Sequence, residues 1–337
     1  MNKSTLRLLG IIVAVLIAAL LLIESGDDGD LPEAGSLLFP EMRAVANDID
    51  RIAIIRTGDT TVVEKREGTW ILPGRGNYAA NITKVREVLL AMSDATVVEA
   101  KTANPDLHGR LGVDAPDDEA SKGTSVTATS GDQSFELVFG NVAQQNFRYA
   151  RVAGEDQSWL IDQNPDIPTE TGQWLNTDII DINSNRIRSV SIVHPDEESI
   201  SIRKDSDAET DFTVAEIPAG RELSYSTVAN GIGGALNDLD LDDVRLHSEP
   251  SESVVARFET FDNVRINVNV SSEDDSKWMS LEIHLPADVA IDGVEEWTAA
   301  RDRVAGWQYK IADYKANLFT RRWEDILKPL EAEPVAE

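Results

Sequence analysis

Histidines are the side chains best suited to bind a metal ion or transfer a proton near neutral pH. The sequence has four: His108, His194, His247 and His284. None has a second histidine or an acid at the spacing of an H-E-x-x-H zinc site. An isolated histidine is more often a surface residue or a hydrogen-bonded core residue than a ligand. We therefore expect no metal ion and no cofactor.

Other catalytic patterns are also missing from the sequence. It contains neither a G-x-S-x-G nucleophile elbow nor a G-x-x-x-x-G-K-[ST] phosphate loop. Gly231, Gly233 and Gly234 fall inside a helical pattern, where they favour close packing over dinucleotide binding. Carboxylates are so frequent that no glycosidase-like pair can be singled out. We expect a protein that is not an enzyme.

The composition limits the partners and the chemistry. Asp and Glu number 60 against 31 Lys and Arg, which gives a net charge of −29. Such a field repels nucleic acid and anionic lipid headgroups, so we expect no nucleic-acid partner. The negative charge indicates either a cationic partner or, as we favour, simply a well-solvated surface. The absence of cysteine excludes disulfides, thiolate catalysis and lipid attachment through cysteine.

A run of uncharged residues, 8–23, follows the basic residues Lys3 and Arg7. This run is long enough for a short membrane-spanning helix and has a poor cleavage site after it. We expect an uncleaved inner-membrane anchor rather than a cleaved signal peptide. The basic residues place the N-terminus in the cytoplasm and the body in the periplasm of a bacterium. Residues spaced along the predicted anchor are Leu8, Ile12, Val15, Ala19 and Ile23.

The predicted organisation is α+β, with the transmembrane helix followed by two similar β-rich lobes, each an antiparallel sheet with a packed helix. The lobes resemble a duplicated domain, because two hairpin patterns, a helix and further strands occur twice in the same order. The predicted segments are the anchor (1–24), a Gly- and Asp-rich tether (25–44), the first lobe (45–183), the second lobe (184–290) and a C-terminal helical segment (291–337).

Each lobe has one predicted helix. In the first lobe, apolar residues fall on one face of residues 81–93, and Asn81 is the expected N-cap. In the second lobe, the same spacing predicts a helix over 225–239. A further helix is expected from Tyr309 to Leu327.

The C-terminal segment is the most basic part of the body. These cations either dock an acidic partner or pair with the chain's own carboxylates, and we favour internal pairing. The candidate docking residues are Arg301, Arg303, Lys310, Arg321 and Arg322.

Several short elements resemble the domain of unknown function 4340 family over roughly residues 45–180. They are Gly68-Thr-Trp-Ile-Leu72, Asn77-Tyr-Ala-Ala-Asn81, Gly109-Arg-Leu-Gly-Val-Asp-Ala-Pro116, Phe139-Gly140, Arg148-Tyr-Ala-Arg151 and Trp174-Leu175. The sequence Asn176-Thr-Asp178 departs from the more basic sequence expected there. The resemblance implies a membrane-anchored extracytoplasmic protein beside an ABC-type permease and a gliding-motility-like auxiliary protein. It implies no catalytic residues.

Two functions follow as expectations. The first is an accessory or scaffold protein associated with an ABC-type transport or export system. The second is a periplasmic protein that binds a polymer or a small solute in a cleft between its lobes.

Overall fold

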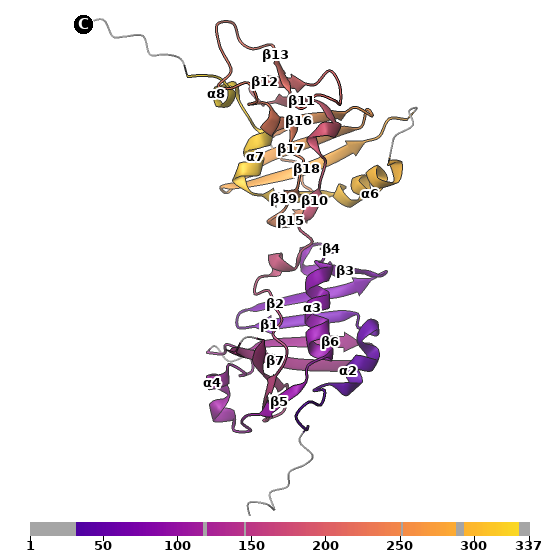
Figure 1. Cartoon of the computed structure of the whole chain (residues 1–337), viewed down its shortest axis with the longest axis vertical. Coiled ribbons are helices and arrows are strands. Elements are labelled where there is room, and N and C mark those ends of the chain that lie inside the picture. Colours follow the sequence, from indigo (N-terminus) through magenta and orange to yellow (C-terminus); the bar gives the residue numbers. More distant parts are fainter. Residues whose placement is uncertain (1–31, 117–119, 145, 251, 288–292, 330–337) are drawn as a thin grey trace, which may run out of the picture. The chain divides into compact units, whose positions relative to one another are not determined.

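The computed structural model describes residues 32–116, 120–144, 146–250, 252–287 and 293–329 (Figure 1). The predicted anchor and the first part of the tether lie outside these ranges. Within them, no helix combines the length and the apolar character that a membrane span requires.

The chain divides into two compact units that each combine several segments. Unit 1 comprises residues up to Ile49, Ile55–Gly58 and Glu87–Asp166, and unit 2 comprises Asp50–Ile54, Asp59–Arg86 and the chain from Ile167. Strand β1 (Arg51–Arg56) and helix α3 (Ile82–Ser93) have residues in both units.

Unit 1 is built around antiparallel strands in the order β6-β7-β8-β9-β5. The strands are β5 (Val97–Ala100), β6 (Thr124–Ser130), β7 (Gln133–Gln144), β8 (Phe147–Val152) and β9 (Ser158–Ile161). Its short helices are α2 (Pro40–Val45), η1 (Ala46–Asp48), η3 (Pro105–Leu107) and α4 (His108–Leu111). The packed interior includes Met42, Leu137 and Phe139, which are all fully buried.

Helix α3 forms as the sequence predicts. The side chain of Asn81 accepts hydrogen bonds from the amides of Thr83 and Lys84, at 3.1 and 3.2 Å, and so caps the first turn. Val88 and Met92 on the apolar face are completely buried. The predicted N-cap and the predicted apolar face of this helix are therefore both confirmed.

Unit 2 begins with short antiparallel strands and then forms an eight-stranded sheet. The first group is β2 (Asp59–Arg66), β3 (Thr69–Leu72), η2 (Pro73–Arg75) and β4 (Tyr78–Ala79). The connecting group is η4 (Thr171–Trp174), β10 (Asp178–Ile180), η5 (Ser184–Arg186) and β14 (Leu239–Asp240), in which β10 pairs with β14.

The eight-stranded sheet is antiparallel, with the order β13-β12-β11-β16-β17-β18-β19-β15 (Figure 1). Its strands are β11 (Ile187–Val193), β12 (Ser199–Arg203), β13 (Thr213–Ala215), β15 (Asp243–Leu246), β16 (Val254–Thr260), β17 (Arg265–Glu273), β18 (Ser276–His284) and β19 (Trp307–Ile311).

Helices pack on this sheet and leave a polar face open. They are α5 (Asn230–Gly233), α6 (Val294–Val304), α7 (Asp313–Phe319) and α8 (Trp323–Ile326). Helix α7 contacts β16, β17 and β18, and the Phe319 ring meets Phe258 edge-on with ring centroids 5.9 Å apart. An antiparallel sheet with one covered face alternates buried and exposed residues along each strand, as β12 does.

The helix predicted over 225–239 is wrong in extent. Only α5 is helical there, and turns occupy the flanking residues. Three glycines at 231, 233 and 234 lower the local helix propensity. The apolar residues nevertheless reach the core, since Ile232 and Leu236 are buried.

The helix predicted from Tyr309 is also corrected. Gly306, with φ of 81°, ends the preceding turn, and residues 307–311 form strand β19 instead. Trp307 and Tyr309 are aromatic residues that favour strands. Helices α7 and α8 follow, so the remainder of the expected segment is helical only in short pieces.

The strand orders of the two units repeat. In unit 1 the consecutive strands β6, β7, β8 and β9 are followed at the edge by the earlier strand β5. In unit 2 the consecutive strands β16, β17, β18 and β19 are followed at the edge by the earlier strand β15. Within unit 2, the antiparallel pair β2 and β3 also has a counterpart in β12 and β13.

Candidate functional site

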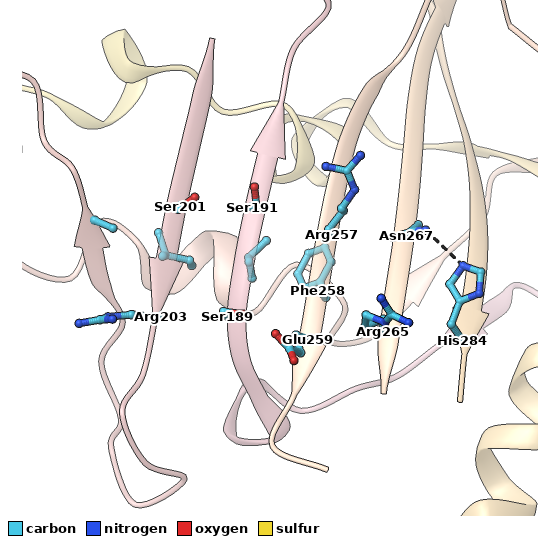
Figure 2. A pocket seen from close by; sticks show the side chains of 13 residues that line it. Ser189, Ser191, Ser201, Arg203, Arg257, Phe258, Glu259, Arg265, Asn267 and His284 are labelled. Atoms are coloured by element: carbon cyan, nitrogen blue, oxygen red, sulfur yellow. Dashed lines mark hydrogen bonds between the residues drawn. The ribbon is translucent and has the colours of Figure 1, made fainter. Parts of the chain in front are cut away.

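The open face of the eight-stranded sheet holds a cavity of about 500 Å³, which we call the sheet groove (Figure 2). Side chains from β11, β12, β13, β16, β17 and β18 line it. Its polar lining residues are Ser189, Ser191, Ser201, Arg203, Arg257, Glu259, Arg265, Asn267 and His284.

Strand alternation brings these polar residues to one face. Along β11, Ser189 and Ser191 are partly exposed, whereas Val190 and Ile192 between and after them are buried. Successive side chains of a strand point to opposite faces. The apolar side chains of each strand therefore pack into the core, and the polar side chains project on the groove face, whose lining also includes Val190, Ile202 and Phe258.

The antiparallel register aligns the groove residues in two rows that cross the strands. The first row contains Arg203, Ser189, Glu259, Arg265 and His284. Neighbouring strands lie about 4.8 Å apart, so this row extends over roughly 19 Å. It is long enough for several separate contacts with one ligand.

The second row lies two residues along each strand. It contains Ser201, Ser191, Arg257 and Asn267, in that order across the sheet. A hydrogen bond of 3.2 Å joins Asn267 Nδ2 and His284 Nε2 (Figure 2). This bond links the two rows at the β17–β18 side of the groove.

The groove carries more positive than negative side chains. Three arginines face one glutamate, Glu259, in its lining. Arg203 lies 3.7 Å from Asp205, and this pair is exposed. Among the described residues, the side chains of Arg257, Arg265 and Glu259 make no ion pair and no hydrogen bond. The groove thus offers unpaired guanidinium groups in a chain with a large excess of acids.

The groove lacks a serine–histidine catalytic pair. Ser189 and His284 belong to the same row but stand three strands apart, roughly 14 Å at the usual strand spacing. An activated nucleophile lies within about 2.6–3.2 Å of its base. Within the ranges that the structure describes, no three His, Asp or Glu side chains gather closely enough to hold a metal ion.

A second cavity of about 590 Å³ lies between the β10–β14 pair and α6. Asp178 and Asp240 are direct partners in the β10–β14 register. Burial raises the pKa of Asp240 above its ordinary value, and the charges of Asp178 and Asp238 raise it further. Like charges thus gather in this cavity, which Arg303 also lines.

The predicted docking cations are distributed over different elements and do not line the sheet groove. Arg301 pairs with Asp302 at 3.0 Å, and Arg303 donates two hydrogen bonds to the carbonyl of Ile179. Lys310 lies on β19 and pairs through its backbone with Asp243.

Arg321 and Arg322 lie between α7 and α8. Arg322 binds Asp196 and Glu198, and the hydrogen bond from Arg322 lowers the pKa of Asp196. The carbonyl of Arg321 is 3.1 Å from His194 Nε2. Arg301 and Arg322 contact carboxylates of this chain, whereas Arg303 contacts a backbone carbonyl.

Two histidines have the structural role expected for isolated residues. His108 is buried, with Nε2 2.8 Å from the carbonyl of Asp156, and His194 is buried beside Arg321. His284 differs, because it lines the sheet groove. The sequence signal for the groove was the alternation of Ser and Arg with apolar residues in 188–203 and 257–267, which we had used only to identify strands.

The short elements that carry the family resemblance form packed contacts in unit 1. A Cβ on Gly140 would lie 2.4 Å from the carbonyl oxygen of Leu111, so only glycine fits. Arg148 Nε donates to the Gly140 carbonyl at 2.7 Å, and the buried Arg151 Nε donates to the Val113 carbonyl at 2.8 Å. These motifs hold the backbone together rather than forming an exposed site.

The tryptophan elements are similarly structural in unit 2. The Trp174 side chain is buried, and its indole donates to the Pro168 carbonyl at 3.4 Å. The Trp174 carbonyl accepts from the amide of Asn81, and the Trp70 carbonyl accepts from the amide of Ala80.

A family model described as "Domain of unknown function (DUF4340)" matches residues 70–259, which is more than half of the chain. Comparisons with curated proteins and with solved structures give no match.

Proposed function

The chain belongs to the DUF4340 family, and from that premise we propose that it is a membrane-anchored extracytoplasmic accessory or scaffold protein. It works by binding rather than by catalysis, beside an ABC-type transport or export system. The sheet groove is the observation that supports this proposal, because it is a preformed surface that combines apolar side chains with unpaired charges.

The architecture supports a binding role in a second way. The repeated strand order favours an origin by duplication of one α+β lobe, each with a sheet and a helix. Duplication supplies two copies of a surface that can then diverge. The predicted anchor, with its N-terminus in the cytoplasm, would hold both lobes in the periplasm at the inner membrane.

Crosslinking in native membranes tests the accessory role. A photo-crosslinking amino acid at the exposed Ser201, in the groove, is compared with the same amino acid at Asp132, in an exposed hairpin turn of unit 1. We expect the Ser201 variant to capture an ABC-type permease subunit, identified by mass spectrometry, and the Asp132 variant to capture much less. Recovery of the chain alone from both, under conditions that trap a known complex, would refute the accessory role.

The second candidate is a periplasmic protein that binds a polymer or a small solute. The size of the sheet groove favours it, since ligand pockets commonly measure about 300–1,000 Å³. Thermal-shift measurements with glycans, peptides and cations would detect such binding as a raised melting temperature. No shift with any of these classes would count against this candidate.

A further inference from the structure

Arg257 and Arg265 are exposed arginines that line the sheet groove. Many described arginines are bonded to carboxylates or carbonyls, as Arg245 is to Glu273 at 2.6 Å and Arg151 is to backbone carbonyls. The chain holds 60 acidic residues, so partners are plentiful. The two groove arginines instead remain without a side-chain partner among the described residues.

The two arginines are diagonal neighbours on adjacent strands. Arg257 on β16 is opposite Asn267 on β17, and Arg265 is two residues before Asn267 on the same face. Diagonal neighbours on one sheet face lie about 7–8 Å apart, within reach of long side chains. Two guanidinium groups can therefore converge on one bound anion, and each can form a paired hydrogen bond with a carboxylate.

The other polar side chains of the lining suit hydroxyl groups, and Val190, Ile202, Ala215 and Phe258 add apolar surface. Ser189, Ser191 and Ser201 lie on the β11–β12 side of the arginines, Asn267 shares β17 with Arg265, and His284 lies beyond them on β18 (Figure 2). Hydroxyl and amide groups both donate and accept hydrogen bonds. A ligand with hydroxyls on either side of an acidic group would match this sequence of side chains across the sheet.

The corresponding face of unit 1 lacks these arginines. Strands β6 and β7 match β16 and β17 in strand order, and their cross-strand pairs are Thr127 with Glu136 and Thr129 with Ser134. The pairs in the groove are Arg257 with Asn267 and Glu259 with Arg265. At these positions of β6 and β7, unit 1 therefore has no arginine, and the arginine pair is particular to β16 and β17.

We propose that the sheet groove binds a short carboxylated saccharide, a uronic-acid oligomer, with Arg257 and Arg265 holding its carboxylates and the serines and Asn267 bonding its hydroxyls. This inference deepens the proposed function and rests on the groove as its binding surface. The single acidic group in the lining, Glu259, opposes the bound charge. A cavity of about 500 Å³ accommodates a short oligomer rather than a long polymer.

Titration calorimetry on the purified full chain in detergent tests the proposal. The probes are tri-galacturonate, a neutral galactose trisaccharide and inorganic phosphate. We expect tri-galacturonate to bind at least about tenfold more tightly than either of the others, with weaker binding as salt is raised. Equal affinity for the neutral trisaccharide, tighter binding of phosphate, or no binding of tri-galacturonate would each overturn the proposal.

Matched variants assign the contact to the groove. R257Q and R265Q should each weaken tri-galacturonate binding by about tenfold or more, as expected for loss of a charge-assisted hydrogen bond. E259Q should strengthen it. R188Q removes the same charge from an exposed residue of β11 outside the groove lining and should leave the affinity unchanged. Equal losses in R188Q and R257Q would refute the assignment.

The saccharide and the membrane partner are tested separately. The calorimetry uses the isolated chain, so it reports on the groove ligand even if crosslinking recovers no permease. Crosslinking at Ser201 reports on the partner even if no saccharide binds. Circular dichroism melting of each variant confirms that a lost affinity is not a lost fold.

Discussion

Gly233 shows how little space a single residue can have in unit 2. It ends α5, and a Cβ at this position would lie 2.1 Å from the ring carbon Cε2 of Phe212. Phe212 is itself buried. Neighbouring Gly231 is different, because its Cβ would meet only the Cδ2 atom of Leu318, at 3.5 Å. Position 233 therefore has no room for a side chain, whereas position 231 has room for a methyl group.

Alanine substitutions at these two positions should have different effects on the free energy of unfolding. G233A should lower the free energy of unfolding by about 1–3 kcal/mol, because the new methyl group forces the Phe212 ring or the backbone to move. G231A should change it by less than about 1 kcal/mol, and in the stabilising direction, because alanine favours the helix. Chemical denaturation of both variants measures the difference. Equal stabilities would contradict the close contact.

The arginines illustrate why single residues could not be assigned roles from sequence. Arg148 and Arg151 belong to a family-like element and hold backbone carbonyls. Arg257 and Arg265 belong to no motif, yet they line the groove. Sequence patterns around 148 and 257 both show arginine on a strand. Only the cross-strand register reveals which side chains meet.

At the scale of elements, strands and capped helices were predictable, and glycine-rich or aromatic segments were not. The hairpins and α3 follow from alternation, from turn residues and from the Asn81 cap. The segment 225–239 kept its helical spacing but formed only α5, because three glycines weaken the helix. Tyr309 fits a helical or a strand pattern. It lies in a strand because β19 forms backbone hydrogen bonds with both β15 and β18.

The β10–β14 pair gives an element-scale test of electrostatics. The pKa of Asp240 is raised, so the folded state holds its proton more tightly than the unfolded state. The contribution of Asp240 to the free energy of unfolding is therefore largest at low pH, and it falls as the pH rises through the raised pKa. D240N removes the effect and should be more stable than the wild type at neutral pH, by less than about 1 kcal/mol for an exposed side chain.

Thermal melts between pH 3 and pH 8 check this expectation. The difference between D240N and the wild type should shrink as pH falls below the ordinary aspartate pKa of 3.8. D132N, in an exposed turn of unit 1, serves as the control. A difference that stays constant over the whole range would rule out titration of Asp240 as its cause.

At the scale of the whole molecule, we propose that the predicted anchor, residues 1–24, holds the chain at the membrane. Deleting residues 1–24 should release the chain from the membrane fraction, because the body is strongly acidic. A glutamate in place of Val15 should also weaken membrane insertion, since a charge at a helix centre costs about 2.5–3.5 kcal/mol. V15A is the control and should stay with the membrane. Carbonate extraction and immunoblotting measure the distribution; a full-length chain in the soluble fraction would refute the anchor.

The order of strands also determines when the second sheet can be completed during synthesis. Strand β15 leaves the ribosome before β16, β17 and β18, yet its hydrogen-bonding partner β19 lies beyond all of them. Until residues 307–311 have emerged, β15 has no neighbour, and the sheet that ends at β18 has an open edge that can pair with other chains. Strand β5 depends on β9 in the same way. The last strand in sequence of each sheet, β19 or β9, therefore joins the earlier strand β15 or β5 to the sheet, and a nascent chain that stops before it leaves that strand unpaired.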